Sequence, residues 1–261
     1  MKKKTGSKVV KKQLASEALA KNASFRGRDV ERIKTGITGF DDLIKGGIPR
    51  GALVLVTGPC GSGKSVFSLQ YLVNGAQKFD EAGTYITFEE APESIRKTGR
   101  IFGWNVDELE RKNKLRITFK EPYEIKDFAK TMSGELYYAL RDCGAKRAVI
   151  DSVSYLSSAL NSPLEVRKTL AELGKHLKSM GVTAFLVSES ADEQPGASGL
   201  GPEEFIVDGV VALHNFLIRD VRQRAIEIIK MRHTQHDRIL HPFEISGSGL
   251  EVYSKEQVFK E

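Results

Sequence analysis

The stretch Gly58-Pro59-Cys60-Gly61-Ser62-Gly63-Lys64-Ser65 decides the fold of this chain, because it fits the pattern G-x-x-x-x-G-K-[ST]. The preceding residues 52–57 (ALVLVT) are almost wholly apolar and rich in β-branched side chains, which is typical of a buried parallel strand. Residues 66–79 then carry the pattern of a helix. A strand, a glycine-rich loop and a helix in this order predict a loop that wraps the phosphates of a nucleoside triphosphate.

Each residue type in this phosphate loop has a chemical reason. Glycine at positions 58, 61 and 63 lets the backbone adopt left-handed conformations and turn its N–H groups inward, near the positive end of the helix dipole. Lys64 can then reach the β- and γ-phosphates, and the Ser65 hydroxyl can bind Mg²⁺. We therefore assign to the nucleotide site the loop and the first residue of the predicted helix, namely Gly58, Pro59, Cys60, Gly61, Ser62, Gly63, Lys64, Ser65 and Val66.

Length and charge divide the chain into a tail and a body. A chain of 261 residues, 40% of them hydrophobic, can bury one large core, so we expect one globular domain. Residues 1–34 hold eight lysines and three arginines against three acidic residues, a net charge of +8, whereas the remaining 29 basic and 31 acidic residues give the body a net charge of −2. We therefore expect a basic tail at 1–30 and a nucleotide-binding domain at 31–261.

The tail resembles neither a signal peptide nor a membrane span, because it lacks an apolar core and no segment approaches ~20 apolar residues. With only two cysteines, one of them in the phosphate loop, the sequence predicts a soluble protein of the reducing cytoplasm. Apolar residues at helical spacing in 10–19 predict a short, weakly amphipathic helix. For the role of the tail, we favour a disordered, solubilising segment over an arm that binds nucleic acid or a partner, because runs of charge are usually just solvated. Any nucleic-acid binding is expected to be weak and to come from this tail.

Further strand and helix patterns predict an α/β fold with a mostly parallel sheet and antiparallel strands at its C-terminal edge. The segments with strand composition are 52–57, 84–88, 115–119, 147–151 and 182–188, and helical stretches separate most of them. From residue 206 onward, short turns separate four segments, 206–213, 224–231, 242–246 and 250–253, which indicates antiparallel pairing. Ser162 and Glu165 have the spacing of a capping box and predict the start of a helix that ends at Gly181.

Polar residues follow the predicted parallel strands, where ligands bind in open sheets of this kind. Asp151 ends an apolar strand and is expected to hold Mg²⁺ opposite Ser65. Glu89 and Glu90 follow the strand that ends at residue 88, and we interpret them as the general base that orients the attacking water. For Ser188 two interpretations stay open, a contact with the γ-phosphate or its water and simple capping of a turn.

Seven motifs occur in an order that resembles a single KaiC-type domain of the RecA/RadA superfamily. They are 35–42 (TGITGFDD), 46–51 (GGIPRG), the phosphate loop, 88–90 (FEE), 102–104 (FGW), 149–152 (VIDS) and 230–232 (KMR), and the resemblance covers about 31–253. It implies a RecA-like P-loop NTPase core that binds ATP with Mg²⁺ and assembles into homo-oligomeric hexamers or filaments with nucleotide at the subunit interfaces. It also implies that Glu89 and Glu90 are the catalytic pair, and that Lys230 and Arg232 contact the nucleotide of a neighbouring subunit. Arg224 matches a position near that neighbouring nucleotide.

Two departures from the family pattern restrict the function. Where the phosphorylating half of the two-domain clock protein carries adjacent Ser and Thr acceptors, this chain has Glu204 and Phe205, which argues against autophosphorylation but not against ATP hydrolysis. The stretch 191–202, which matches the DNA-binding loop of related recombinases, holds two acidic residues and no Lys or Arg. Because phosphate contacts dominate DNA affinity, this composition argues against recombinase-like DNA binding through that loop.

Three functions remain in competition. The first is an oligomeric ATPase whose hydrolysis switches a ring between states that a partner detects, which would make it a regulatory or signalling protein. The second is a RadA-paralogue DNA-binding protein of recombination or repair, with the basic tail as its nucleic-acid arm. The third is a nucleotide-sensing scaffold with little turnover, and the presence of Glu89, Glu90 and Asp151 argues against it.

Overall fold

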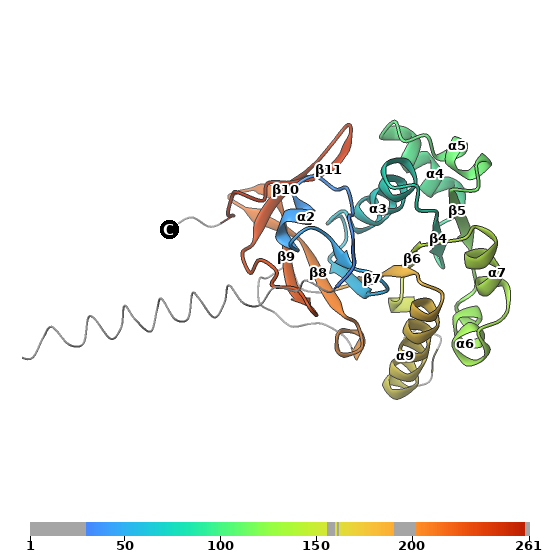
Figure 1. The fold of residues 1–261 in the computed structure, drawn as a ribbon. Coiled ribbons are helices and arrows are strands. Elements are labelled where there is room, and N and C mark those ends of the chain that lie inside the picture. The colour runs from blue at the N-terminus through green and yellow to red at the C-terminus, as the bar shows by residue number, and fades with distance from the viewer. Residues whose placement is uncertain (1–29, 156–159, 161, 191–201, 259–261) are drawn as a thin grey trace, which may run out of the picture. The chain divides into compact units, whose positions relative to one another are not determined.

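A nine-stranded sheet is the centre of the unit Glu31–Glu261 in the computed structural model. The structure describes residues 30–155, 160, 162–190 and 202–258, as Figure 1 shows. The predicted tail helix at 10–19 and residues 191–201 of the stretch that matches the DNA-binding loop of recombinases lie outside the described residues. Both therefore stay predictions. Within the described ranges, no helix is long and apolar enough to cross a membrane.

Six strands of the sheet run parallel, in the order β8-β3-β7-β6-β4-β5. Their bounds are Leu53–Gly58 for β3, Gly83–Thr87 for β4, Leu115–Phe119 for β5, Arg147–Asp151 for β6, Thr183–Glu189 for β7 and Gly209–Ile218 for β8. All five strands predicted in the first part of the chain are confirmed. The apolar runs of β3, β6 and β7 fit strands that are buried on both faces, whereas β5, at the edge of the sheet, is only partly buried.

The C-terminal edge of the sheet is antiparallel, as predicted. β9 (Val221–Met231), β10 (His241–Ser246) and β11 (Gly249–Val252) follow β8 in the order of the chain and pair with one another. The strand β8 differs from the prediction, because it pairs parallel with β3 on one side and antiparallel with β9 on the other. A small separate sheet joins β1 (Arg32–Ile33) to β2 (Ile48–Pro49).

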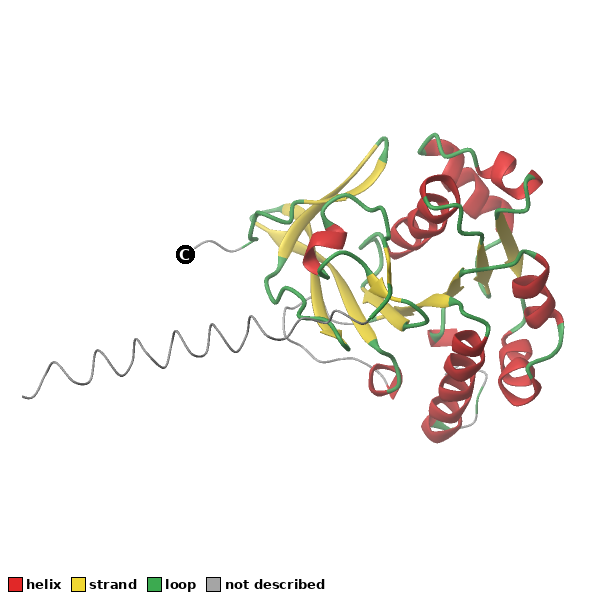
Figure 2. Ribbon diagram, in the orientation of Figure 1, coloured by secondary structure: helices red, strands yellow, loops and turns green. Residues whose placement is uncertain are grey.

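Helices cover both faces of the parallel part of the sheet, as Figure 2 shows. One face carries α3 (Lys64–Lys78), α4 (Pro92–Ile101) and α5 (Val106–Arg111), and the other carries α6 (Pro122–Thr131), α7 (Glu135–Asp142) and α9 (Pro163–Ser179). Alternate residues of β3 divide between the two cores: Val54 and Val56 pack on the α3 side, whereas Leu53 and Leu55 pack on the α9 side. The short helices α2 (Phe40–Leu43) and η1 (Pro202–Phe205) complete the described elements.

Local sequence signals explain where the two long helices begin. α9 begins at Pro163, and the Oγ of Ser162 accepts a hydrogen bond of 3.2 Å from the backbone N–H of Glu165, as the capping pattern predicted. α3 begins at Lys64, two residues earlier than predicted. The first turn of α3 therefore contains both the lysine and the serine of the phosphate loop.

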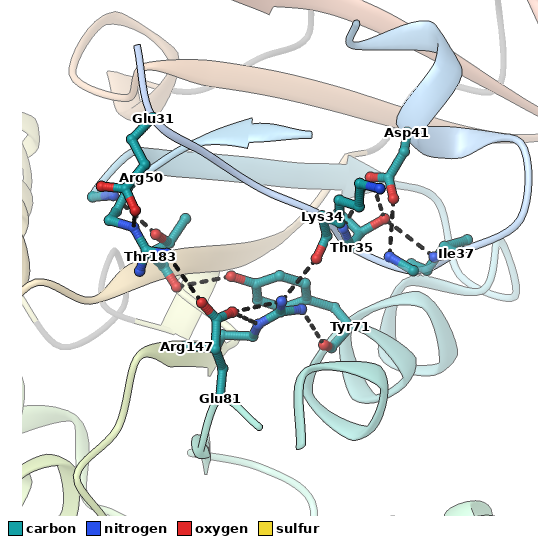
Figure 3. A network of polar contacts seen from close by, with 12 residues as sticks. Glu31, Lys34, Thr35, Ile37, Asp41, Arg50, Tyr71, Glu81, Arg147 and Thr183 are labelled. Atoms are coloured by element: carbon teal, nitrogen blue, oxygen red, sulfur yellow. Dashed lines mark hydrogen bonds and ion pairs between the residues drawn. The ribbon is translucent and has the colours of Figure 1, made fainter. Parts of the chain in front are cut away.

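A buried polar network ties the start of β6 to the N-terminal segment of the body (Figure 3). The guanidinium of Arg147 is fully buried and donates from Nε to Glu81 Oε2 at 2.8 Å, from Nη1 to the Tyr71 carbonyl at 3.0 Å and from Nη2 to the Lys34 carbonyl at 2.7 Å. Gly75 in α3 makes room for it, since a Cβ there would lie 2.5 Å from Arg147 Cδ. We call these residues, together with Arg50 and Glu31, the Arg147 network.

Candidate nucleotide site

A pocket of about 410 Å³ lies at the carboxyl ends of β3, β4, β6 and β7, the edge of the sheet where the sequence predicted a site. Its volume falls in the range of small-molecule sites, roughly 300–1,000 Å³. The residues that line it are Cys60, Gly61, Gly63, Lys64, Ser65, Val66, Thr87, Glu89, Glu90, Asp151, Ser152, Glu189, Arg224 and Ile245. The structure therefore brings most of the predicted loop residues and all three predicted carboxylates together.

The phosphate loop holds its lysine against its own backbone. Gly63 has a φ of 97° just before α3, a conformation that strains any residue with a Cβ, and such a Cβ would also lie 2.8 Å from Ile245 Cδ1. Lys64 Nζ donates to the carbonyls of Gly58 at 2.8 Å and Pro59 at 3.0 Å. Burial lowers the pKa of Lys64, and the neighbouring carboxylate of Glu189 partly offsets that effect. The loop thus places a largely buried ammonium group in the lining of the pocket.

Asp151 and Ser65 meet as the sequence predicted for a Mg²⁺ site. Ser65 Oγ donates to Asp151 Oδ2 at 3.4 Å, and the hydroxyl of Tyr85 donates to the same oxygen. Burial raises the pKa of the Asp151 carboxyl, whereas the hydrogen bonds from Tyr85 and Ser65 favour its ionised form. These hard oxygen ligands fit Mg²⁺, which is usually held by one or two carboxylates together with substrate phosphates. In the described part of the chain, no cluster of three His, Cys, Asp or Glu offers a metal site of another kind.

The Glu89-Glu90 pair is held by a turn that the sequence analysis missed. Thr87 Oγ1 accepts hydrogen bonds from the backbone N–H groups of Glu89 at 3.3 Å and Glu90 at 3.0 Å, and it donates to the Glu90 carbonyl at 2.9 Å. Ser152 Oγ donates to Glu89 Oε1 at 3.1 Å, and Ser94 Oγ donates to Glu90 Oε1. Glu89 is thereby tied to the end of β6 and Glu90 to α4. A Thr two residues before an acidic pair was the available signal for this turn.

Ser188 does not line the pocket, whereas Arg224 does. Ser188 is nearly buried and hydrogen-bonds with Ser154 Oγ at 3.1 Å, and its neighbour Glu189 lines the pocket instead. Arg224 lines the pocket too, and its Nε donates to the carbonyl of Gly61 at 3.4 Å. The structure therefore places Arg224 beside the phosphate loop of its own chain.

Lys230 and Arg232 lie on the side of the sheet where the parallel strands begin, whereas the pocket lies where those strands end. Lys230 pairs with Val210, which in turn pairs with Leu55 near the start of β3. Lys230 Nζ donates to the carbonyls of Glu204 at 3.0 Å and Val207 at 2.7 Å, and burial lowers its pKa. Arg232 Nη1 forms an ion pair of 3.2 Å with Asp208 Oδ1. The structure does not bring these two cations to the phosphate loop of their own chain.

Comparison with known proteins fits this geometry. A family model described as "ATPase: KaiC" matches residues 33–257. The chain belongs to the KaiC ATPase family. The circadian clock oscillator protein KaiC of Nostoc sp. is 39% identical over 233 residues, which cover 87% of this chain and 45% of the relative. The KaiC of Synechococcus elongatus is 35% identical over 247 residues, covering 92% of this chain and 47% of that protein.

A solved structure of the same family matches over its whole length. The KaiC-like protein of the hyperthermophilic archaeon Pyrococcus horikoshii OT3 is 36% identical, with a TM-score of 0.75, and the match covers 86% of this chain and 99% of that chain. The chain therefore spans about half the length of the curated KaiC relatives but nearly all of this archaeal KaiC-like protein.

Proposed function

We propose that this chain binds ATP with Mg²⁺ in the pocket at the phosphate loop and hydrolyses it. The observation that carries the proposal is the meeting, in one pocket, of the buried Lys64 ammonium, the Ser65–Asp151 pair and the two glutamates. Mg²⁺ would be held by Ser65 and Asp151, and when bound it would neutralise charge on the β- and γ-phosphate oxygens.

The residues of the chain then have separate roles. Lys64 exchanges the carbonyl oxygens of Gly58 and Pro59 for phosphate oxygens, and its desolvation makes that attraction stronger than it would be in water. Glu90 accepts the proton of the water that attacks the γ-phosphate, and Glu89, which receives a hydrogen bond from Ser152, supports it. Thr87 holds the backbone of both glutamates at the end of β4.

We infer further that a second copy of the chain completes the site. Lys230 and Arg232 lie at the sheet edge opposite their own phosphate loop, so a role at a nucleotide requires the loop of another subunit. A cation delivered in this way stabilises charge on the departing γ-phosphate and is worth about 10³ to 10⁵ in rate. The KaiC relatives of Nostoc sp. and Synechococcus elongatus are circadian clock oscillator proteins, and we propose that this chain likewise uses ATP turnover as a regulatory or signalling switch.

The test mixes two inactive variants. Arg232→Ala lacks the cation and Glu90→Gln lacks the base, so each alone is expected to be nearly inactive. A mixed assembly contains interfaces with an intact Glu90 on one side and an intact Arg232 on the other, so ATPase activity should partly return. The measurement is phosphate release at a series of total protein concentrations and a fixed mixing ratio. The rate per subunit should rise with concentration, because activity requires assembly.

The control replaces the Arg232 variant with Lys64→Ala. That variant is expected not to bind ATP in calorimetric titration, because the ammonium on the β- and γ-phosphates is gone. In its mixture with Glu90→Gln, every subunit that binds ATP lacks the base, so no activity should return. No recovery in the Arg232 mixture despite demonstrated subunit exchange, or a specific rate independent of dilution, would refute completion of the site by a second copy. Parental ATP affinity in Lys64→Ala would refute the nucleotide site itself.

A further inference from the structure

Tyr85 reaches the Mg²⁺-site carboxylate from inside the core. Tyr85 lies on β4 and pairs with Val149 on β6, and both side chains belong to the core on the α3 side of the sheet. Asp151 is two residues beyond Val149, so its side chain leaves β6 on that same face. The phenol ring is fully buried, and its hydroxyl donates to Asp151 Oδ2.

Two donors converge on a single oxygen of this carboxylate. Ser65 Oγ, from the first turn of α3, donates to Oδ2 at 3.4 Å, and the Tyr85 hydroxyl, from the neighbouring strand β4, donates to the same atom. In the part of the chain that the structure describes, these are the side-chain donors to Asp151. The second oxygen, Oδ1, is left for groups in the pocket, which Asp151 lines.

A second buried tyrosine shows that this contact is not required to satisfy the hydroxyl. Tyr71, on α3, is buried as completely as Tyr85 and belongs to the same core. Its hydroxyl donates to the backbone carbonyl of Thr183 at 3.1 Å, and neither Tyr71 nor Thr183 lines the pocket. A buried tyrosine hydroxyl needs a partner, and a backbone carbonyl is sufficient. The partner of Tyr85 is instead the carboxylate on which the proposed function depends.

We propose that Tyr85 is a positioning residue of the Mg²⁺ site, whose hydroxyl holds Asp151 Oδ2 beside Ser65 and keeps Oδ1 directed to the pocket. The proposal rests on the proposed ATP·Mg²⁺ binding and adds a residue to it. The packed ring cannot follow a moving carboxylate, so the hydrogen bond restricts the rotamer of Asp151. Groups that hydrogen-bond a metal-ligating carboxylate typically change metal affinity or activity by about 10- to 100-fold when removed.

The experiment compares Tyr85→Phe with Tyr71→Phe, which remove one buried hydroxyl each and keep the ring. ATP binding is titrated by calorimetry at a series of Mg²⁺ concentrations, and Mn²⁺ binding in the presence of a non-hydrolysable ATP analogue is measured by electron paramagnetic resonance. We expect Tyr85→Phe to need about 10-fold more Mg²⁺ or Mn²⁺ for half-maximal binding. Tyr71→Phe should keep the parental cation dependence, and thermal unfolding checks that both variants are folded.

A double variant separates positioning from general loosening of the core. If Tyr85 acts through the carboxylate, Tyr85→Phe should cause no further shift in cation dependence once Asp151→Asn is present. A parental cation dependence in Tyr85→Phe, or an equal shift in Tyr71→Phe, would overturn the role of Tyr85 while leaving the proposed function intact. A parent protein that binds ATP with no dependence on Mg²⁺ would instead refute the Mg²⁺ site and this inference together.

Discussion

The two ends of strand β6 hold charged side chains in opposite ways. Arg147 begins the strand and Asp151 ends it, and both are removed from bulk water to a large degree. The guanidinium of Arg147 is bonded to the protein at all three nitrogens, and it also lies 4.8 Å from the ring centroid of Tyr71. Within the residues that the structure describes, the Asp151 side chain is hydrogen-bonded at Oδ2 alone, and it lines the pocket. One end of the strand is closed by protein partners, and the other is open to a ligand.

We infer from this contrast that the charge of Arg147 stabilises the fold, whereas the charge of Asp151 lowers its stability. A buried charge is tolerated when its partners are in place, and removal of one partner leaves an uncompensated charge behind. At the open end, burial raises the pKa of Asp151 and so disfavours its ionised form. Functional sites commonly carry such a cost. The comparison therefore predicts opposite signs for the loss of a charge at the two ends.

The largest effect is expected at the closed end. Arg147→Met should lower the free energy of unfolding by about 3–5 kcal/mol, because Glu81 and the carbonyls of Tyr71 and Lys34 lose their partner in a buried place. The measurement is urea unfolding at a fixed pH. ATP affinity per folded molecule should be unchanged, since no residue of the Arg147 network lines the pocket.

The double variant Arg147→Met/Glu81→Gln is the control for that result. It also removes the Glu81 carboxylate, which without Arg147 would keep only the partly exposed Arg50 as an ion-pair partner, so part of the lost stability should return. If the double variant is less stable than the parent by the full sum of the two single effects, Glu81 is not the uncompensated charge. The closed end would then be held by packing and not by this ion pair.

An intermediate effect of the opposite sign is expected at the open end. Without Mg²⁺, Asp151→Asn should raise the free energy of unfolding by about 1 kcal/mol while it abolishes Mg²⁺-dependent hydrolysis, because a neutral amide is cheaper to bury than a carboxylate. The matched control is Asp41→Asn. Asp41 accepts hydrogen bonds from Thr35 N at 2.9 Å, Thr35 Oγ1 at 2.8 Å and Gly36 N at 3.0 Å.

That control should move in the other direction. Both oxygens of Asp41 are used by the protein, so Asp41→Asn should lose about 1–2 kcal/mol in the same urea titration. A loss of stability in Asp151→Asn comparable to that of Asp41→Asn would show that the open end stabilises the fold like the closed one. The distinction between the two ends of β6 would then fail.

The open end was predictable from sequence because its signals are local. The phosphate loop, Glu89-Glu90 and Asp151 each lie at the carboxyl end of a strand, and the rule that ligands bind there in parallel sheets brings them together. The details were less accessible. Tyr85 lies in the middle of a strand. Its hydroxyl reaches Asp151 only because β4 pairs with β6 in a register that sets Tyr85 opposite Val149, two residues before Asp151.

The closed end was not predicted at all, and the reason is sequence separation. Arg147 bonds residues that are 66 to 113 positions away, and no short pattern links them. The available signals were an arginine at the start of an otherwise apolar strand and a glycine, Gly75, inside a long helix. The placement of Lys230 and Arg232 on a neighbouring nucleotide also stays a prediction, since it concerns a second copy of the chain.

The smallest effect is expected at the rim of the Arg147 network, and it tests whether burial or charge decides the comparison. Arg50 Nη2 lies 3.2 Å from Glu81 Oε1, and Arg50 Nε lies 2.7 Å from Glu31 Oε1, but the side chains of Arg50 and Glu31 are 33% and 71% exposed. Exposed ion pairs contribute about 0–1 kcal/mol and are screened by salt. Arg50→Ala should therefore cost about 0.5 kcal/mol, and less at high salt. A loss as large as that of Arg147→Met, unaffected by salt, would mean that the network acts as one charged unit, and burial would no longer explain why the two ends of β6 differ.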